Sequence, residues 1–170
     1  ELFVNKKHIK EAEKEKYLGN YLTKYASPAA TMIDRKSKGY GILGEIKAIL
    51  NDIPLGCRRV EIGLTLREAW FLNGTLYNSE VWCNFNKSDL KDLEVLDRKI
   101  LRCILGAHPK SPLEMLYLET HVLQITDLVS IRRLSYYQNI LKRHKDEIVK
   151  KVFVTQQSSP LKGDWVKLVE

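Results

Sequence analysis

The sequence predicts a mainly α-helical protein: a short β-hairpin, a three-helix bundle, and then a second helical segment. Three observations lead to this prediction. Apolar residues recur at a helical spacing of three and four positions through most of the chain. Capping residues and prolines mark helix starts, and Gly106 marks a helix end. Strand-favouring Tyr, Leu and Thr cluster near the N-terminus. We expect boundaries at 1–26, 27–106 and 107–170.

The composition is that of a soluble globular protein. The chain has 170 residues, of which 44% are hydrophobic and 29% charged, as in ordinary soluble domains. It contains neither an apolar run of roughly 18 residues nor a signal-peptide pattern. The odd number and wide spacing of Cys57, Cys83 and Cys103 favour reduced core thiols over a disulfide framework. We therefore expect an intracellular protein, nuclear or cytoplasmic, without a membrane partner. Since no methionine begins it, we interpret the chain as part of a longer protein.

The first segment, 1–26, has strand chemistry. Leu2–Val4 predicts a short strand, a polar connection follows, and Lys16–Lys24 predicts a second strand. Two strands this close can pair as a hairpin, but a lone hairpin is marginally stable in water. We therefore expect the hairpin to complete a larger sheet whose other strands lie upstream of this chain.

The second segment begins with a helix. Ser27 and Pro28 predict its start, and it should run to about Asp52, before a turn at 54–56. Three glycines in six positions should weaken or kink its middle. The residues expected to form its apolar stripe are Ile42, Ile46, Ile49 and Ile53.

A long buried helix is predicted over Arg58–Trp82, and it organises the bundle. Apolar residues cover most of its circumference, which is typical of a helix packed on several sides. Gly63 and Gly74 inside it indicate close approach by neighbouring helices. The residues of its main apolar stripe are Ile62, Leu66, Ala69, Trp70, Leu76, Tyr77 and Val81.

Ser88 should cap the third helix of the bundle, Asp89–Leu105, which Gly106 should end. Its acidic residues lie near the start and its basic residues toward the end, as the helix dipole favours. The residues of its apolar face are Leu90, Leu93, Leu96, Ile100, Leu101, Ile104 and Leu105.

The last segment should contain three further helices. A capping box from Ser111 to Glu114 predicts a short helix that ends near Thr120. A long helix should span Gln124–Arg143, and another 146–156, with Trp165 anchoring the tail. The residues expected to be buried in the long helix are Ile125, Leu128, Val129, Ile131, Leu134, Tyr137, Ile140 and Leu141.

The sequence offers no catalytic constellation. Cys103 and His108 have no second pair that would complete a zinc site. No glycine-rich phosphate loop occurs, and no pair of aspartates stands where two magnesium ions could be held. We therefore predict a chain that is non-catalytic by itself, with no catalytic residue, metal site or cofactor of its own.

Basic clusters are the main remaining functional signal. The net charge is +7 and the pI about 9.3. Clusters occur at 35–38, Arg58–Arg59, Arg132–Arg133 and 142–145. Such clusters can contact a phosphate backbone, especially near glycines and tyrosines. They can equally be solvated helix faces.

An ordered series of motifs resembles one family. KYLG at 16–19 with the following Tyr21-Leu22-Thr23 resembles a segment of non-LTR (LINE-type) retrotransposon reverse transcriptases. Downstream, KGYG, IPLG and EIGL, and then the segments at 73–82 and 112–120, are similar to the region that follows in these enzymes. The resemblance covers nearly the whole chain.

This resemblance implies an RNA-directed DNA polymerase fragment: the end of the palm at 1–26, a helical thumb at 27–106 and a post-thumb segment at 107–170. It implies Mg²⁺ held by palm aspartates, which this chain lacks. Its implied partners are the upstream palm and fingers of the same polyprotein and an RNA–DNA or RNA template–primer duplex. The residues implied near the primer grip are Lys16, Tyr17 and Gly19. The residues implied as duplex contacts are Lys36, Lys38, Lys47, Arg58 and Arg59.

A rival interpretation remains open: a helical protein–protein interaction module whose basic residues only keep it soluble. Convergence of the basic residues of 35–59 on one concave face would favour the thumb, and a dominant exposed apolar groove would favour the rival. A third interpretation, a metal-dependent hydrolase, requires carboxylates and histidines gathered in one pocket.

Overall fold

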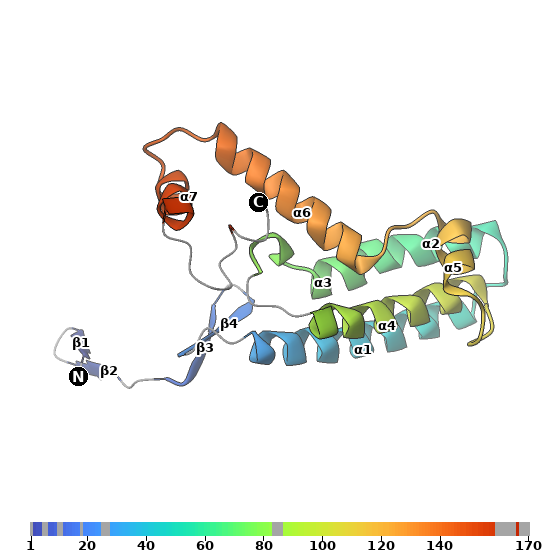
Figure 1. Ribbon diagram of the computed structural model, residues 1–170. Helices are drawn as coiled ribbons and strands as arrows, with labels where there is room; N and C mark the ends of the chain where they lie inside the picture. Colours follow the sequence, from blue (N-terminus) through green and yellow to red (C-terminus); the bar gives the residue numbers. More distant parts are fainter. Residues whose placement is uncertain are drawn as a thin grey trace.

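The computed structural model describes residues 2–4, 7–9, 12–17, 19–24, 28–82, 87–158 and 166. The protein is mainly helical, with a hairpin before the helices, as predicted. Figure 1 shows α1, α2 and α4 lying side by side as a bundle, with α6 running obliquely away from it and the strands at one end.

The N-terminal strands differ from the prediction. Strand β1 (Leu2–Val4) pairs with β2 (Lys7–Ile9), and β3 (Lys14–Tyr17) pairs with β4 (Asn20–Thr23), both antiparallel. The predicted single strand over Lys16–Lys24 is therefore wrong. It is broken at Gly19, whose φ of +80° belongs to the left-handed region that glycine adopts readily. Lys16 consequently lies opposite Tyr21 in the same hairpin.

Helix α1 spans Ala29–Asn51 without interruption, so its glycines do not break it. Gly39 faces the core, where a Cβ would lie 2.9 Å from Leu96 Cδ1. The predicted apolar stripe is wrong in part, because Ile49 is exposed. The predicted cap, Ser27, lies outside the described residues. The stripe that faces the core is Met32, Arg35, Gly39, Leu43, Ile46 and Leu50.

The predicted central helix forms as α2 (Cys57–Leu66), a π-helical stretch η1 (Arg67–Leu72) and α3 (Asn73–Thr75). It ends earlier than predicted, and a 3₁₀ turn η2 (Ser79–Val81) follows a left-handed Asn78. The wider turn of η1 shifts the buried face. Ala69 and Trp70, both expected in the core, are exposed. Tyr77 and Val81 are exposed as well, because they lie beyond the end of α3.

Gly63 and Gly74 mark close helix contacts, as predicted. A Cβ on Gly63 would lie 2.6 Å from Ile104 Cγ1, and one on Gly74 would lie 3.0 Å from Ile42 Cδ1. The first of these distances leaves no room for a methyl group, because the Cβ and Cγ2 atoms of Ile104 are also close.

Gly63→Ala is therefore expected to lower the free energy of unfolding by about 1–3 kcal/mol through overpacking. The matched control is Gly44→Ala in α1, where nothing lies within 4 Å of the added Cβ. That change should instead raise stability by about 0.5–1 kcal/mol, because alanine favours helix interiors. Urea unfolding followed by circular dichroism measures both, and equal effects of the same sign would contradict the packing.

Helix α4 spans Lys87–Leu105 and ends at Gly106, whose φ is +62°. Its predicted apolar face is confirmed. Residues 83–86, which include Cys83, lie outside the described residues. Of the other cysteines, Cys103 is half-buried but Cys57 is exposed. The fully buried residues of the α4 face are Leu93, Leu96, Ile100, Leu101 and Ile104.

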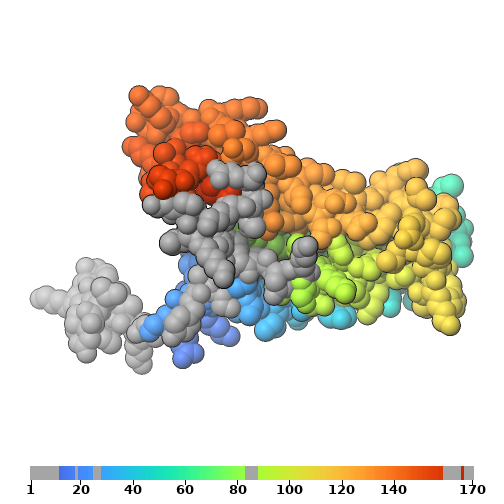
Figure 2. All heavy atoms as spheres, in the orientation of Figure 1, coloured from blue at the N-terminus to red at the C-terminus, as the bar shows by residue number. Residues whose placement is uncertain are grey.

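The last segment forms α5 (Leu113–Thr120), α6 (Ile125–Lys142) and α7 (Ile148–Ser158). No side-chain cap forms at α5, which follows Pro112 directly, so the capping-box prediction is wrong. Figure 2 shows α6 open to solvent along one side. Three of its residues predicted as core are accordingly exposed: Ile131, Leu134 and Leu141. A second small cluster consists of Ile140, Phe153 and Val166, while Trp165 lies outside the described residues.

Candidate nucleic-acid interface

An open groove of about 880 Å³ runs between α1 and α4. Lys47 of α1 and Lys99 of α4 are exposed along it, and Arg102 of α4 is half-buried in its wall. Among the described residues that line the groove, none is acidic. A concave surface that carries charge of one sign attracts the opposite charge, so this groove favours an anion.

Tyr40 places an aromatic ring beside these cations. Its side chain is 56% exposed, and Lys99 Nζ lies 5.6 Å from the centroid of its ring. Cations next to an exposed aromatic ring can bind a phosphate backbone while the ring contacts a sugar or base. The groove therefore combines the two kinds of side chain that sequence-independent nucleic-acid binding uses.

Only some of the hydrogen-bond donors of Arg102 have partners within the protein. One of its Nη atoms donates to Ser111 O at 3.3 Å, and its Nε is buried without a hydrogen-bond partner. From the sequence, the position of Lys99 and Arg102 near the end of their helix indicates only a favourable interaction with the helix dipole, so neither is predicted as a site residue. The spacing of three residues, which places both on one side of α4, is the signal that was available.

Lys36 lies one helical turn before Tyr40 and forms an ion pair with Asp92 of α4. Both side chains are partly exposed, so this pair links α1 and α4 at the surface with little effect on stability. Because Asp92 neutralises it, Lys36 contributes less to an anion site than Lys47, which has no partner among the described residues.

Arg59 lines the same groove, but its guanidinium is bound to backbone carbonyl groups of the protein, so its role as a duplex contact stays a prediction. Arg59 is 8% exposed. Its guanidinium donates to Leu50 O in the last turn of α1 and, at 2.7 Å, to Ile53 O in the bend that follows. It also donates to Cys103 O at 2.9 Å and Ile104 O at 3.2 Å, which end α4. Arg59 is thus a buried link between two helix C-termini, whose partial negative charge favours a cation.

Arg58 and Tyr17 are both exposed, but the structure does not bring them to the α1–α4 groove. Arg58 lies near the start of α2 and is not a lining residue. Tyr17 ends β3 and is 61% exposed. These two predicted contacts remain predictions.

Lys16 and Lys38 lie apart from the groove, at the strand end of α1. Both pair with Asp34, Lys16 at 3.3 Å and Lys38 at 3.4 Å. Partial burial raises the pKa of the Asp34 carboxyl, but the hydrogen bonds and charges of the two lysines outweigh it, and the pKa is lowered. Asp34 therefore stays ionised and shares its charge between both predicted contacts.

Arg35 fixes the β3–β4 hairpin to the bundle. Its guanidinium donates to Gly19 O at 2.9 Å and to Asn20 Oδ1 at 3.1 Å, and on the other side to Gly74 O at 2.9 Å. Gly19, predicted near the primer grip, is thus half-buried and held through its carbonyl. The first basic cluster therefore contains one structural arginine.

The later basic cluster also has structural roles. Arg132 of α6 donates to Leu76 O at 2.7 Å, and Arg133 donates to Trp82 O at 3.1 Å. Both side chains are half-buried. They attach α6 to the end of the central helix, where its backbone carbonyls need donors.

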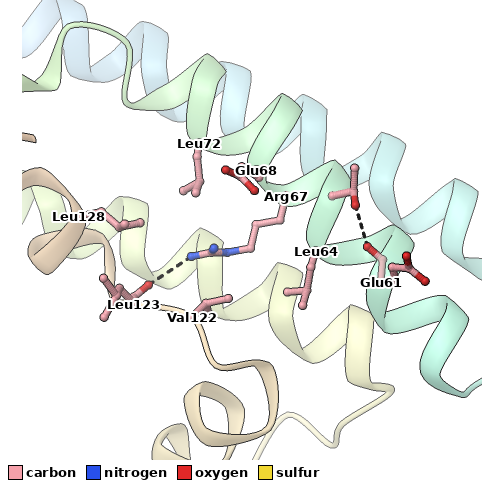
Figure 3. A pocket seen from close by; sticks show the side chains of 9 residues that line it. Glu61, Leu64, Arg67, Glu68, Leu72, Val122, Leu123 and Leu128 are labelled. Carbon is pink, nitrogen blue, oxygen red and sulfur yellow. Dashed lines mark hydrogen bonds between the residues drawn. The ribbon is translucent and has the colours of Figure 1, made fainter.

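A second open groove, of about 480 Å³, lies between the central helix and the start of α6. In Figure 3, Leu64, Leu72 and Leu128 border the space across which Arg67 extends. Arg67 is buried and forms two hydrogen bonds with Asp97, at 2.6 and 2.9 Å. The exposed charges of its lining are acidic, Glu61 and Glu68.

Neither a family model, nor a curated protein, nor a solved structure matches this chain. Within the described ranges, no group of three or more His, Cys, Asp or Glu side chains could hold a metal ion. Of the helices in the same part of the chain, none has the length and hydropathy needed to cross a membrane.

Proposed function

We propose that the chain binds the sugar–phosphate backbone of a nucleic-acid duplex through the α1–α4 groove, as the helical thumb of an RNA-directed DNA polymerase. The observation that carries the proposal is the convergence of Lys47, Lys99 and Arg102 beside Tyr40 in a groove whose described lining has no carboxylate. Of the described basic residues of 35–59, only Lys47 and the buried Arg59 line this groove, and Lys99 and Arg102 of α4 supply its other cations. The motif resemblance to LINE-type reverse transcriptases supplies the polymerase context.

The role of these residues is to position a duplex. Lysine and arginine side chains contact phosphates whatever the base sequence, so they fix orientation without reading bases. The Mg²⁺ ions and aspartates of polymerisation belong to a palm upstream of this chain. The β3–β4 hairpin, held by Arg35, would lie between that palm and the groove, with Lys16 and Tyr17 on it.

The direct test is the affinity of the chain for a labelled RNA–DNA hybrid, measured by fluorescence anisotropy. The variant Lys47→Ala/Lys99→Ala should bind roughly tenfold or more weakly, because each lost contact is a charge-assisted hydrogen bond to phosphate. The matched control is Lys91→Ala/Lys151→Ala, which removes two exposed lysines outside the groove and outside the basic clusters. Equal losses for both variants would contradict a site in the groove.

A helical protein–protein interaction module remains the second candidate, and the acidic, partly apolar groove beside the central helix favours it. Of the two grooves described above, the basic one is the larger. If the wild-type chain does not bind the hybrid near physiological salt, the interaction module becomes the better account.

A further inference from the structure

The groove between the central helix and the start of α6, called here the acidic groove, has surface chemistry opposite to that of the α1–α4 groove. Its walls are Leu64, Leu72, Val122, Leu123 and Leu128 (Figure 3). Leu123 is exposed, and Glu61 and Glu68 carry the only exposed charges among the described lining residues. Arg67 is already neutralised by Asp97. In a chain with a net charge of +7, this groove suits a partner that is apolar on one side and basic beside it.

Helix α7 has this complementary chemistry. Its sequence contains Lys150 and Lys151 and no acidic residue. Ile148 is 79% exposed and Val152 51%, and one helical turn separates them, so they form an exposed apolar patch on α7. Lys150 donates a hydrogen bond to Leu141 O of its own chain, whereas Lys151 lies beside the apolar patch.

The dimensions of the two elements also agree. The eleven residues of α7 form a helix of about 16 Å, and the backbone from Glu61 to Leu72 covers about the same length. Such a helix lying in an apolar groove is a common mode of recognition, with anchors one turn apart.

The α7 of the same chain does not fill the groove. It packs through Phe153 against Ile140, near the C-terminal end of α6. Leu128, which lines the groove, lies near the other end of α6, about 18 Å away along the helix axis. The α7 that could occupy the groove is therefore the one of another copy of the chain.

We propose that the acidic groove binds α7 of a second copy of this chain, with Ile148 and Val152 against its leucines and Lys151 beside Glu68. Phe153 keeps α7 attached to its own α6, so docking requires no rearrangement of the fold. One helix in one groove is a small interface, so the association is weak and visible only at high protein concentration. The proposal does not depend on nucleic-acid binding.

The test is sedimentation equilibrium of the full chain, freed of nucleic acid, across a wide concentration range. The wild type should associate as concentration rises. Glu68→Lys and Lys151→Glu should each weaken association roughly tenfold, since each places like charges together. The two changes combined should restore it. The control Lys91→Glu, at an exposed site on α4 outside both elements, should leave it unchanged.

Restored association in the combined variant would establish this pairing, because two harmful changes rarely cancel unless the residues meet. A wild-type chain that stays monomeric throughout would overturn the proposal. So would association that neither single change weakens, or that the combined variant fails to recover.

Discussion

Replacing Arg59 with alanine is expected to lower the free energy of unfolding by about 3–5 kcal/mol, from lost hydrogen bonds and a new cavity. Four carbonyl groups at or just after the ends of α1 and α4, two of them buried and two partly buried, accept hydrogen bonds from this guanidinium. Without it they lose a charged donor, and a cavity remains where the side chain was. A loss of this size is a large part of the total stability of a domain.

Urea unfolding followed by circular dichroism measures this loss, and the neighbouring residue supplies the control. Arg58→Ala removes the same charge from an exposed position, so its effect should stay within about 0.5 kcal/mol. Arg59→Lys keeps the charge but cannot reach both helix ends with a planar fork, and should fall between the two. Similar stabilities for the Arg58 and Arg59 alanine variants would show that the carbonyl network contributes little.

Replacing Asp97 with alanine is expected to have a similar effect, about 3–5 kcal/mol, because it leaves the buried Arg67 guanidinium without its counter-charge. Burial raises the pKa of the Asp97 carboxyl, and the hydrogen bonds and charge of Arg67 oppose this rise. The carboxylate and the guanidinium therefore depend on each other, and neither is tolerated alone.

A double-mutant cycle tests this dependence. Adding Arg67→Leu to Asp97→Ala should recover much of the lost stability, since an apolar side chain needs no partner in the core. The control is Asp92→Ala, on the same helix as Asp97. It breaks only the exposed ion pair with Lys36 of α1 and should lower the free energy of unfolding by at most about 1 kcal/mol. Additive losses at positions 67 and 97 would mean that the pair is not a coupled unit.

The sequence predicts the helices well where one face is buried throughout. Helix α4 has its apolar residues on a single stripe, packs on α1 and α2 along that stripe, and ends at a left-handed glycine. On α6, in contrast, apolar periodicity predicts too many buried residues, because only part of the apolar surface of this helix meets the bundle. Periodicity identifies apolar residues, but it does not tell how many neighbours a helix has.

The buried side of the central helix shows a different limit. Its core-facing residues follow a spacing of four, Arg59, Gly63, Arg67, Phe71 and Thr75, and two of them are arginines. Arginine is usually a surface residue, so the sequence predicts Arg59 as a ligand contact and predicts a buried face that includes Trp70. Backbone carbonyls at helix ends and the buried Asp97, which make this side suitable for arginine, appear only after the helices are packed.

The basic groove depends on packing in the same way. Lys47 was predicted as a contact, but Lys99 and Arg102 are more than fifty positions away in the sequence and come close only because α1 packs on α4. The sequence shows how many cations the chain has. The structure separates those held internally, such as Arg35 and Arg59, from those left for a ligand.

The most direct test of nucleic-acid binding in the α1–α4 groove is the salt dependence of hybrid binding by the wild type and the two lysine variants. Each phosphate contact contributes about −0.9 to the slope of log K against log salt. Lys47→Ala/Lys99→Ala should therefore have a slope shallower by about 2 than the wild type. Lys91→Ala/Lys151→Ala should keep the wild-type slope. Equal slopes for the wild type and the groove variant would contradict phosphate contact by Lys47 and Lys99.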